Sequence, residues 1–157
     1  MGLLPRAKIK SAFYGMETEI VITKGSNYGK ALDGVKVVLI ERHDDLRSAL
    51  AEFLSQRGAR VIGFPQPSQA LEAVEQMQAD VVILELTEDE NGFQLFRTIR
   101  ILQPETVANT PVIAMNSPGF GLLRNRALKE GFNEYLDKPF TPKKMLESIQ
   151  SALHFSG

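Results

Sequence analysis

Apolar and polar positions follow two different periods along most of this chain. From residue 35 onward, short runs of consecutive apolar residues alternate with longer segments in which apolar residues recur every three or four positions. The short runs are typical of strands buried on both faces, and the longer period is typical of amphipathic helices. The expected strands are 35–40, 60–64, 80–85, 111–115 and 133–137. The alternation predicts an α/β domain with a parallel sheet.

The segments between the strands carry helix start and stop signals. Ser68 is expected to cap the second helix, and Thr141 to cap the last one, with Pro142 at its first position. Gly58 and Gly131 suit the ends of the first and fourth helices. The expected helices begin at 44 or 45, at 68, and then cover 92–102, 120–130 and 142–153. Five such units predict a doubly wound sheet, whose sites lie at the carboxyl ends of the strands.

The first 34 residues do not share this pattern. They contain five basic and three acidic residues and one short β-like run. We interpret residues 1–34 as an extension that is flexible at its start, with a short strand at 18–23. Residues 35–157 then form the single packed domain.

Composition limits the classes of function. The chain of 157 residues has no cysteine and a formal net charge of −1, so it has no thiolate zinc site and no global field that attracts nucleic acid or a membrane. His43 and His154 are the only histidines, too few for a multi-histidine metal site. No apolar run approaches the roughly 20 residues that span a bilayer. We expect a cytoplasmic protein without a bound cofactor.

Several segments together resemble the receiver domain of bacterial two-component response regulators. The stretch 126–140, which ends in Lys138-Pro139-Phe140 just before the last helix, follows that family's pattern position by position, as do 44–47 and 92–95. The resemblance covers 35–154. It implies a flavodoxin-like five-stranded parallel sheet of order 2-1-3-4-5, with helices on both faces.

The resemblance also implies a site at the strand ends. Receivers place two carboxylates after strand one and a phosphoacceptor aspartate after strand three, which together bind a divalent cation. A hydroxyl after strand four and a lysine after strand five hold the phosphoryl oxygens. By this correspondence, Glu85 takes the phosphoacceptor position, Glu41 and Arg42 the acidic pair, Asn116 the hydroxyl, and Lys138 is unchanged.

These differences predict a degenerate site. The side chain of Glu85 is one methylene longer than aspartate, which would misplace an attacking oxygen by about 1 Å. Arg42 carries a permanent positive charge that cannot coordinate a cation. We therefore expect no metal, no catalytic residue and no enzymatic activity. Instead, Arg42 is expected to replace the metal in a salt-bridge cluster, with Lys138 paired to Glu85 and the fold held in one state.

The expected function is that of a stand-alone, atypical receiver that signals or scaffolds by binding another protein, independently of phosphorylation. The partner would be a kinase, a phosphotransferase or an effector, with a homodimer as a further option. The resemblance places the contact surface, which would be basic, on Tyr135, Arg124, Lys129, Lys143 and Lys144.

Two alternatives stay open. One is a phosphoacceptor that still uses Mg²⁺, with Glu85 or Asp89 as the nucleophile. The other is a small-ligand binder that uses the Gly119–Gly121 turn.

Overall fold

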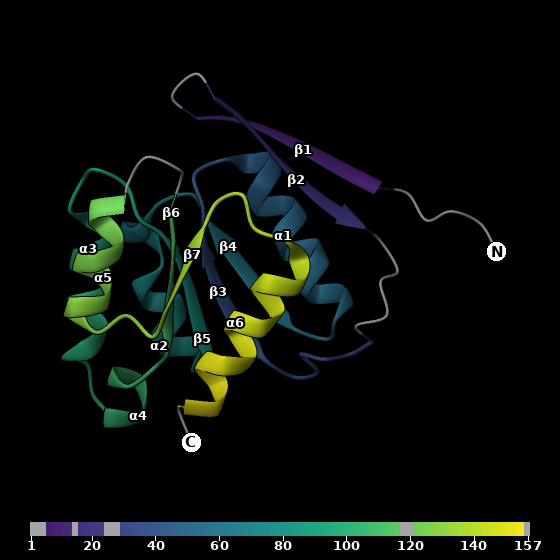
Figure 1. Ribbon diagram of the computed structural model, residues 1–157. Coiled ribbons are helices and arrows are strands. Elements are labelled where there is room, and N and C mark those ends of the chain that lie inside the picture. Colours follow the sequence, from purple (N-terminus) through teal and green to yellow (C-terminus); the bar gives the residue numbers. More distant parts are fainter. Residues whose placement is uncertain (1–5, 14–15, 24–28, 117–120, 156–157) are drawn as a thin grey trace.

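A five-stranded parallel sheet forms the centre of the molecule (Figure 1). The structure is a computed structural model that describes residues 6–13, 16–23, 29–116 and 121–155. The strands are β3 (Lys36–Ile40), β4 (Arg60–Phe64), β5 (Val81–Glu85), β6 (Val112–Asn116) and β7 (Glu134–Asp137). Their spatial order is β4-β3-β5-β6-β7, with every pair parallel. This confirms the predicted doubly wound fold with order 2-1-3-4-5.

Helices cover both faces of the sheet. They are α1 (Asp44–Gln56), α2 (Leu71–Met77), α3 (Asn91–Arg100), the short α4 (Glu105–Ala108), α5 (Gly121–Glu130) and α6 (Pro142–Phe155). Side chains of α1 and α6 pack with Val37 and Leu39 on one face. Side chains of α2, α3, α4 and α5 pack with Val38 and Ile40 on the other, because successive strand residues point to opposite faces. Among the described residues, no helix has both the length and the apolar character needed to cross a membrane.

The local helix signals were correct at α6 and wrong at α2. The Thr141 hydroxyl accepts the Lys144 backbone N–H at 3.1 Å, and Pro142 is the first residue of α6, as predicted. Ser68 does not cap α2. It lies in a 3₁₀ turn, Pro67–Gln69, and α2 begins only at Leu71. The Ala70 N–H bonds to the Pro67 carbonyl at 3.1 Å, so the tighter turn takes the position expected for the first helical turn.

The N-terminal segment forms a separate two-stranded sheet. Strands β1 (Arg6–Phe13) and β2 (Met16–Thr23) pair antiparallel, with Phe13 opposite Met16. The strand expected at 18–23 lies within β2. Strand β1 was not expected, although residues 6–10 alternate polar and apolar as half-buried strands do. Leu32 is fully buried in the core beside α1, and its N–H bonds to the Arg57 carbonyl at 2.9 Å. Packing of the main body therefore begins a few residues before position 35.

Candidate functional site

Four buried polar residues lie at the carboxyl edge of the sheet. Glu85 and Asn116 end β5 and β6, and Glu41 and Lys138 directly follow β3 and β7. Because the strands are parallel, these four positions reach the same edge. All four are buried, with Glu41 at 0% and both Glu85 and Lys138 at 3% exposure. Ionisable groups this deeply buried are retained in proteins only when they are paired.

Lys138 provides that pairing by bridging the two carboxylates. Its Nζ atom donates to Glu41 Oε1 at 2.8 Å and Oε2 at 3.0 Å, and to Glu85 Oε2 at 2.7 Å. The predicted contact between Lys138 and Glu85 is present, and Lys138 also bonds to Glu41. Charge-assisted bonds of this length are among the strong ones in proteins.

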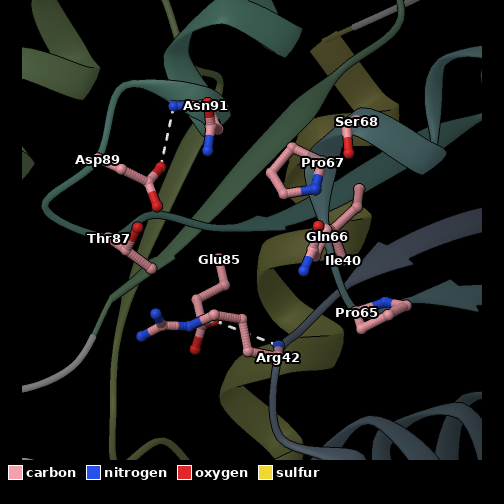
Figure 2. A pocket seen from close by; sticks show the side chains of 11 residues that line it. Ile40, Arg42, Pro65, Gln66, Pro67, Ser68, Glu85, Thr87, Asp89 and Asn91 are labelled. Carbon is pink, nitrogen blue, oxygen red and sulfur yellow. Dashed lines mark hydrogen bonds and ion pairs between the residues drawn. The ribbon is translucent and has the colours of Figure 1, made fainter.

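Arg42 lies over the outer side of Glu85 (Figure 2). Its backbone N–H and its Nε atom both donate to Glu85 Oε1, at 3.3 and 3.2 Å. The side chain of Arg42 is 47% exposed, in contrast to the buried carboxylate that it covers. Each oxygen of Glu85 therefore accepts from a cationic side chain: Lys138 from the interior and Arg42 from the solvent side.

His43 is a member of this cluster that the sequence did not point to. Its Nδ1 atom lies 3.3 Å from Glu41 Oε1, and its side chain is partly buried. The one available signal was its position two residues after a strand-end glutamate. Ligand atoms of Glu41, His43 and Glu85 lie within 4.8 Å of one another.

This donor set does not fit Mg²⁺. Magnesium prefers oxygen ligands in an octahedral arrangement. Here the third donor is an imidazole, and the Lys138 ammonium already bonds to both carboxylates. A second cation, Arg42, bonds to Glu85 from outside. A hard divalent ion at these carboxylates would have to displace Lys138 and approach against the charge of Arg42.

The surroundings of Glu41 and Glu85 shift the pKa values of these two glutamates in opposite directions. Burial raises the pKa of Glu41. Burial acts in the same direction on Glu85, but hydrogen bonding to Glu41 and the charge of Lys138 outweigh it and lower the pKa of Glu85 to about 2. Hydrogen bonding to Glu41 raises the pKa of His43. On acidification, Glu41 and His43 therefore take up protons before Glu85 does.

Comparison with models of known protein families identifies the family of this chain. The family model of the response regulator receiver domain matches residues 37–150. The chain belongs to this family. The receiver domain is thus a module of two-component signal transduction, a class whose members contact kinases or effector proteins.

Relatives of this receiver domain include two transcriptional regulators. It is 30% identical over 122 residues to the transcriptional regulatory protein GltR of Pseudomonas aeruginosa, and 29% identical over 122 residues to CpxR of Escherichia coli, covering 77% of this chain and 50% of each regulator. The chain therefore spans about half the length of these relatives. It is also 28% identical over 123 residues to an uncharacterised 14.6 kDa protein of Leptolyngbya boryana, covering 77% of this chain and 92% of that protein.

Solved structures support the fold. A receiver domain from Clostridium thermocellum superposes with a TM-score of 0.68 at 23% identity, covering 77% of this chain and 95% of that one. NtrX from Brucella abortus gives a TM-score of 0.70 at 21% identity, covering 78% of this chain and 28% of that one.

Tyr135 of the receiver domain, expected on the contact surface, points inward. It is 7% exposed and packs in the core between β6 and the helices of that face. The guanidinium carbon of Arg124 lies 5.3 Å from the centroid of its ring, and Arg124 also pairs with Asp137 at 2.7 Å. Burial raises the pKa of Tyr135. The aromatic ring is thus held beneath Arg124 rather than presented to solvent.

The surface formed by α5, β7 and α6 is less basic than the sequence suggested. Lys129, Lys143 and Lys144 are exposed, as expected. However, Lys143 lies 3.9 Å from Glu147, and Arg124 pairs with Asp137 as described above. The expectation counted cations and did not consider the acids that folding brings beside Arg124 and Lys143.

A pocket of ≈ 230 Å³ opens beside Arg42 and Glu85 (Figure 2). Asp89, one of the two alternative nucleophiles, lines it and accepts the Asn91 N–H at 3.0 Å in the turn that begins α3. Gly119, expected in a ligand-binding turn, lies outside the described residues, and Gly121 begins α5. The other lining residues are Ile40, Pro65, Gln66, Pro67, Ser68, Thr87 and Gly92.

Proposed function

We propose that this receiver domain is an atypical, phosphorylation-independent signalling or scaffolding module that acts by binding another protein. The observation that carries the proposal is the position of Lys138, which bonds to both Glu41 and Glu85 while Arg42 covers Glu85. Two protein cations therefore neutralise the two carboxylates that, in other receivers, correspond to metal ligands and phosphoacceptor.

This arrangement argues against phosphoryl transfer on chemical grounds. Phosphoryl transfer relies on positioning and on a divalent cation that neutralises developing charge. Glu85 is longer than aspartate, and its oxygens already accept bonds from Arg42 and Lys138. A nucleophile that is misplaced by about 1 Å and held in two ion pairs loses orders of magnitude in rate. The proposal therefore includes the absence of enzymatic activity and of a metal cofactor.

The same contacts support a fold held in one signalling state. In receivers, a phosphorylated aspartate bonds to the lysine after the last strand. Here the Glu85 carboxylate makes a permanent 2.7 Å bond to Lys138. Tyr135 on β7 is buried, and so is Asn116 at the end of β6. Because one conformational state is favoured at all times, the surface outside these residues keeps its binding-competent conformation.

We place the partner-binding surface on α5, β7 and α6. A groove of ≈ 480 Å³ lies there, with Arg124 and Lys144 at its polar wall and Leu128 and Phe140 among its apolar residues. The partner is a kinase, a phosphotransferase or an effector protein. A second copy of this chain is a further candidate for the same surface. The net charge of −1 gives no support for binding nucleic acid or membrane.

The proposal is tested with the partner captured by crosslinking and then purified. We expect Glu85→Ala to change the Kd for this partner at least several-fold without any phosphodonor, because it removes the group that Lys138 and Arg42 hold. The matched control is Glu75→Ala, an exposed glutamate on α2. Equal affinity of wild type and Glu85→Ala would remove Glu85 from the signalling mechanism.

A second arm tests phosphorylation directly. Wild-type protein incubated with acetyl phosphate and Mg²⁺ should show no added phosphoryl group in intact-mass spectra. A stoichiometric phosphoryl adduct on Glu85 or Asp89 would overturn the proposal in favour of a phosphoacceptor.

The pocket beside Arg42 favours one alternative function, the binding of a small ligand. Its walls combine prolines, hydroxyls and amides with one guanidinium and the carboxylates of Glu85 and Asp89, at the sheet edge where α/β proteins commonly bind ligands. A compound that raises the Tm of the free protein, and loses this effect in Arg42→Ala, would favour ligand binding over protein binding.

A further inference from the structure

A row of charged side chains crosses from the loop before α3 to α5. Arg126 on α5 grips Glu90 with both terminal nitrogens, at 2.6 Å to Oε1 and 2.5 Å to Oε2. Its Nε atom donates to Glu130 Oε1 at 3.3 Å, and Arg97 of α3 donates to the same oxygen at 2.6 Å. The four residues thus alternate in charge from the loop to the end of α5.

Arg126 differs from an ordinary surface arginine because one face of its guanidinium is covered. Its central carbon lies 3.8 Å from the centroid of the Phe93 ring, and Phe93 is fully buried in α3. A guanidinium stacked on an aromatic ring and paired in a two-pronged geometry is held in one place. Arg126 therefore binds α5 to two elements at once: α3 through Phe93 and the preceding loop through Glu90.

Apolar packing alone holds α5 weakly. Of the residues of α5, Ala127 is the one that is buried and Leu123 is partly buried against the core, whereas Leu122 is 87% and Leu128 47% exposed. By comparison, α3 buries five residues in the core, Gly92, Phe93, Leu95, Phe96 and Ile99. The contacts of Arg126 are thus a larger share of what positions α5 than ion pairs are for a well-buried helix.

The loop that contains Glu90, the partner of Arg126, directly follows Glu85, the last residue of β5. Leu86 is buried, and its N–H bonds to the Met115 carbonyl at 2.8 Å; Asp89 then caps the N–H of Asn91. Glu90 lies within this turn, directly before the first residue of α3. The chain therefore offers a short, internally bonded path from the buried Glu85 to the carboxylate that Arg126 holds.

We propose that Arg126 is a positioning residue that couples the Glu85 loop, residues 86–90, to helix α5. A change at Glu85 moves or loosens this loop, and the Glu90–Arg126 pair transmits the change to α5. The coupling is a property of the free protein. Its consequence for partner binding rests on the proposed function, because α5 forms one wall of the proposed surface.

Hydrogen–deuterium exchange of the free protein tests the coupling. In Arg126→Gln we expect amides of both α5 and residues 86–90 to exchange roughly 2–5-fold faster, the range for losing a surface ion-pair network. The matched control is Arg97→Gln, which removes the ion pair between α3 and α5 and leaves both hydrogen bonds from Arg126 to Glu90 in place. It should leave exchange in residues 86–90 unchanged.

The partner residue provides a reciprocal check. Glu90→Gln should produce the same acceleration in α5, and the double variant with Arg126→Gln should add little to either single change. At about 1 M salt the difference from wild type should narrow, because exposed ion pairs are screened. Unchanged exchange at residues 86–90 in Arg126→Gln, or equal acceleration there in Arg97→Gln, would overturn the coupling.

Glu85→Ala separates this inference from the proposed function. It should accelerate exchange in α5 in the wild-type background and not in the Arg126→Gln background. If it changes α5 but leaves the Kd for the partner unchanged, the proposed function fails and the coupling stands. If it leaves α5 unchanged, the coupling fails whatever the partner affinity.

Discussion

Replacing Lys138 with methionine tests the central cluster most severely. Methionine has nearly the same length and fits a buried position, but it removes the ammonium that bonds to Glu41 and Glu85. Both carboxylates are buried, so they cannot recover these bonds from bulk water. Arg42 would remain at one oxygen of Glu85, with a side chain that is half exposed.

We expect Lys138→Met to lower the free energy of unfolding by about 3–5 kcal/mol at neutral pH, the usual effect of removing one partner from a buried ion pair. The charge of Lys138 acts together with the hydrogen bond to Glu41 in lowering the pKa of Glu85, which is the direction expected if Lys138 stabilises the ionised carboxylate. Such a loss would be a large share of the roughly 5–15 kcal/mol that stabilises a typical domain.

The pH dependence gives the prediction a definite sign. In the wild type, the lowered pKa of Glu85 contributes stability that is present above pH 4.5 and is lost as the pH falls from 4.5 towards 2. In Lys138→Met, the attraction is gone and burial raises the pKa of the carboxyls. A raised carboxyl pKa lowers the free energy of unfolding at high pH, and this loss becomes smaller as the pH falls towards 4.5. The gap between variant and wild type should therefore shrink on acidification.

Urea unfolding followed by circular dichroism at about pH 7.5 and about pH 5 measures both effects. Lys144→Met, at an exposed position on α6, is the control and should cost less than about 0.5 kcal/mol. A loss below about 1 kcal/mol for Lys138→Met at neutral pH, or a gap that does not shrink at pH 5, would refute the buried cluster as described.

Three further predictions concern the same edge of the sheet. Millimolar Mg²⁺ should cause no saturable amide NMR shifts near Glu41, Glu85 or Lys138; saturable shifts there would revive a phosphoacceptor with a metal. Arg42→Ala should cost about 0.5–1 kcal/mol in urea unfolding, because its side chain is 47% exposed and solvent screens the pair; an unchanged stability would show that the contact with Glu85 contributes nothing. Glu85→Asp alone should gain no acetyl-phosphate adduct, whereas Glu85→Asp combined with Arg42→Asp should bind Mg²⁺ measurably more tightly than the single variant, which titration calorimetry can compare.

Much of the fold was readable from local pattern. Consecutive apolar residues at Val81–Leu84 and a helical period in α1 each depend on neighbours within a few positions, so the sequence carries them directly. The departures arose where competing short-range geometries have similar energies. Ser68 was a valid cap by residue type, but a 3₁₀ turn after Pro67 formed instead. Strand β1, which pairs with β2, carries a polar–apolar alternation over residues 6–10 that was not recognised as a strand signal.

The sequence predicted which residues belong to the site, but not every pair that they form with one another. The sequence by itself determined that Glu41, Glu85, Asn116 and Lys138 meet at one edge, because parallel strands bring their carboxyl ends together. Tertiary structure decided that Lys138 bridges both glutamates, 97 and 53 positions away in the chain. It also brought His43 to Glu41. Distances between side chains depend on how whole elements pack, and residue order contains that information only through the complete fold.

The same reason explains the contact between Glu90 and Arg126, which are 36 positions apart. From the sequence alone, each residue is expected to be an exposed charge, Glu90 in a loop and Arg126 on a helix. Their pairing exists because α3 and α5 pack side by side on the same face of the sheet, with Phe93 beneath the guanidinium. Local sequence determined which charges this receiver domain carries, and the packing of its helices decided which of them are joined.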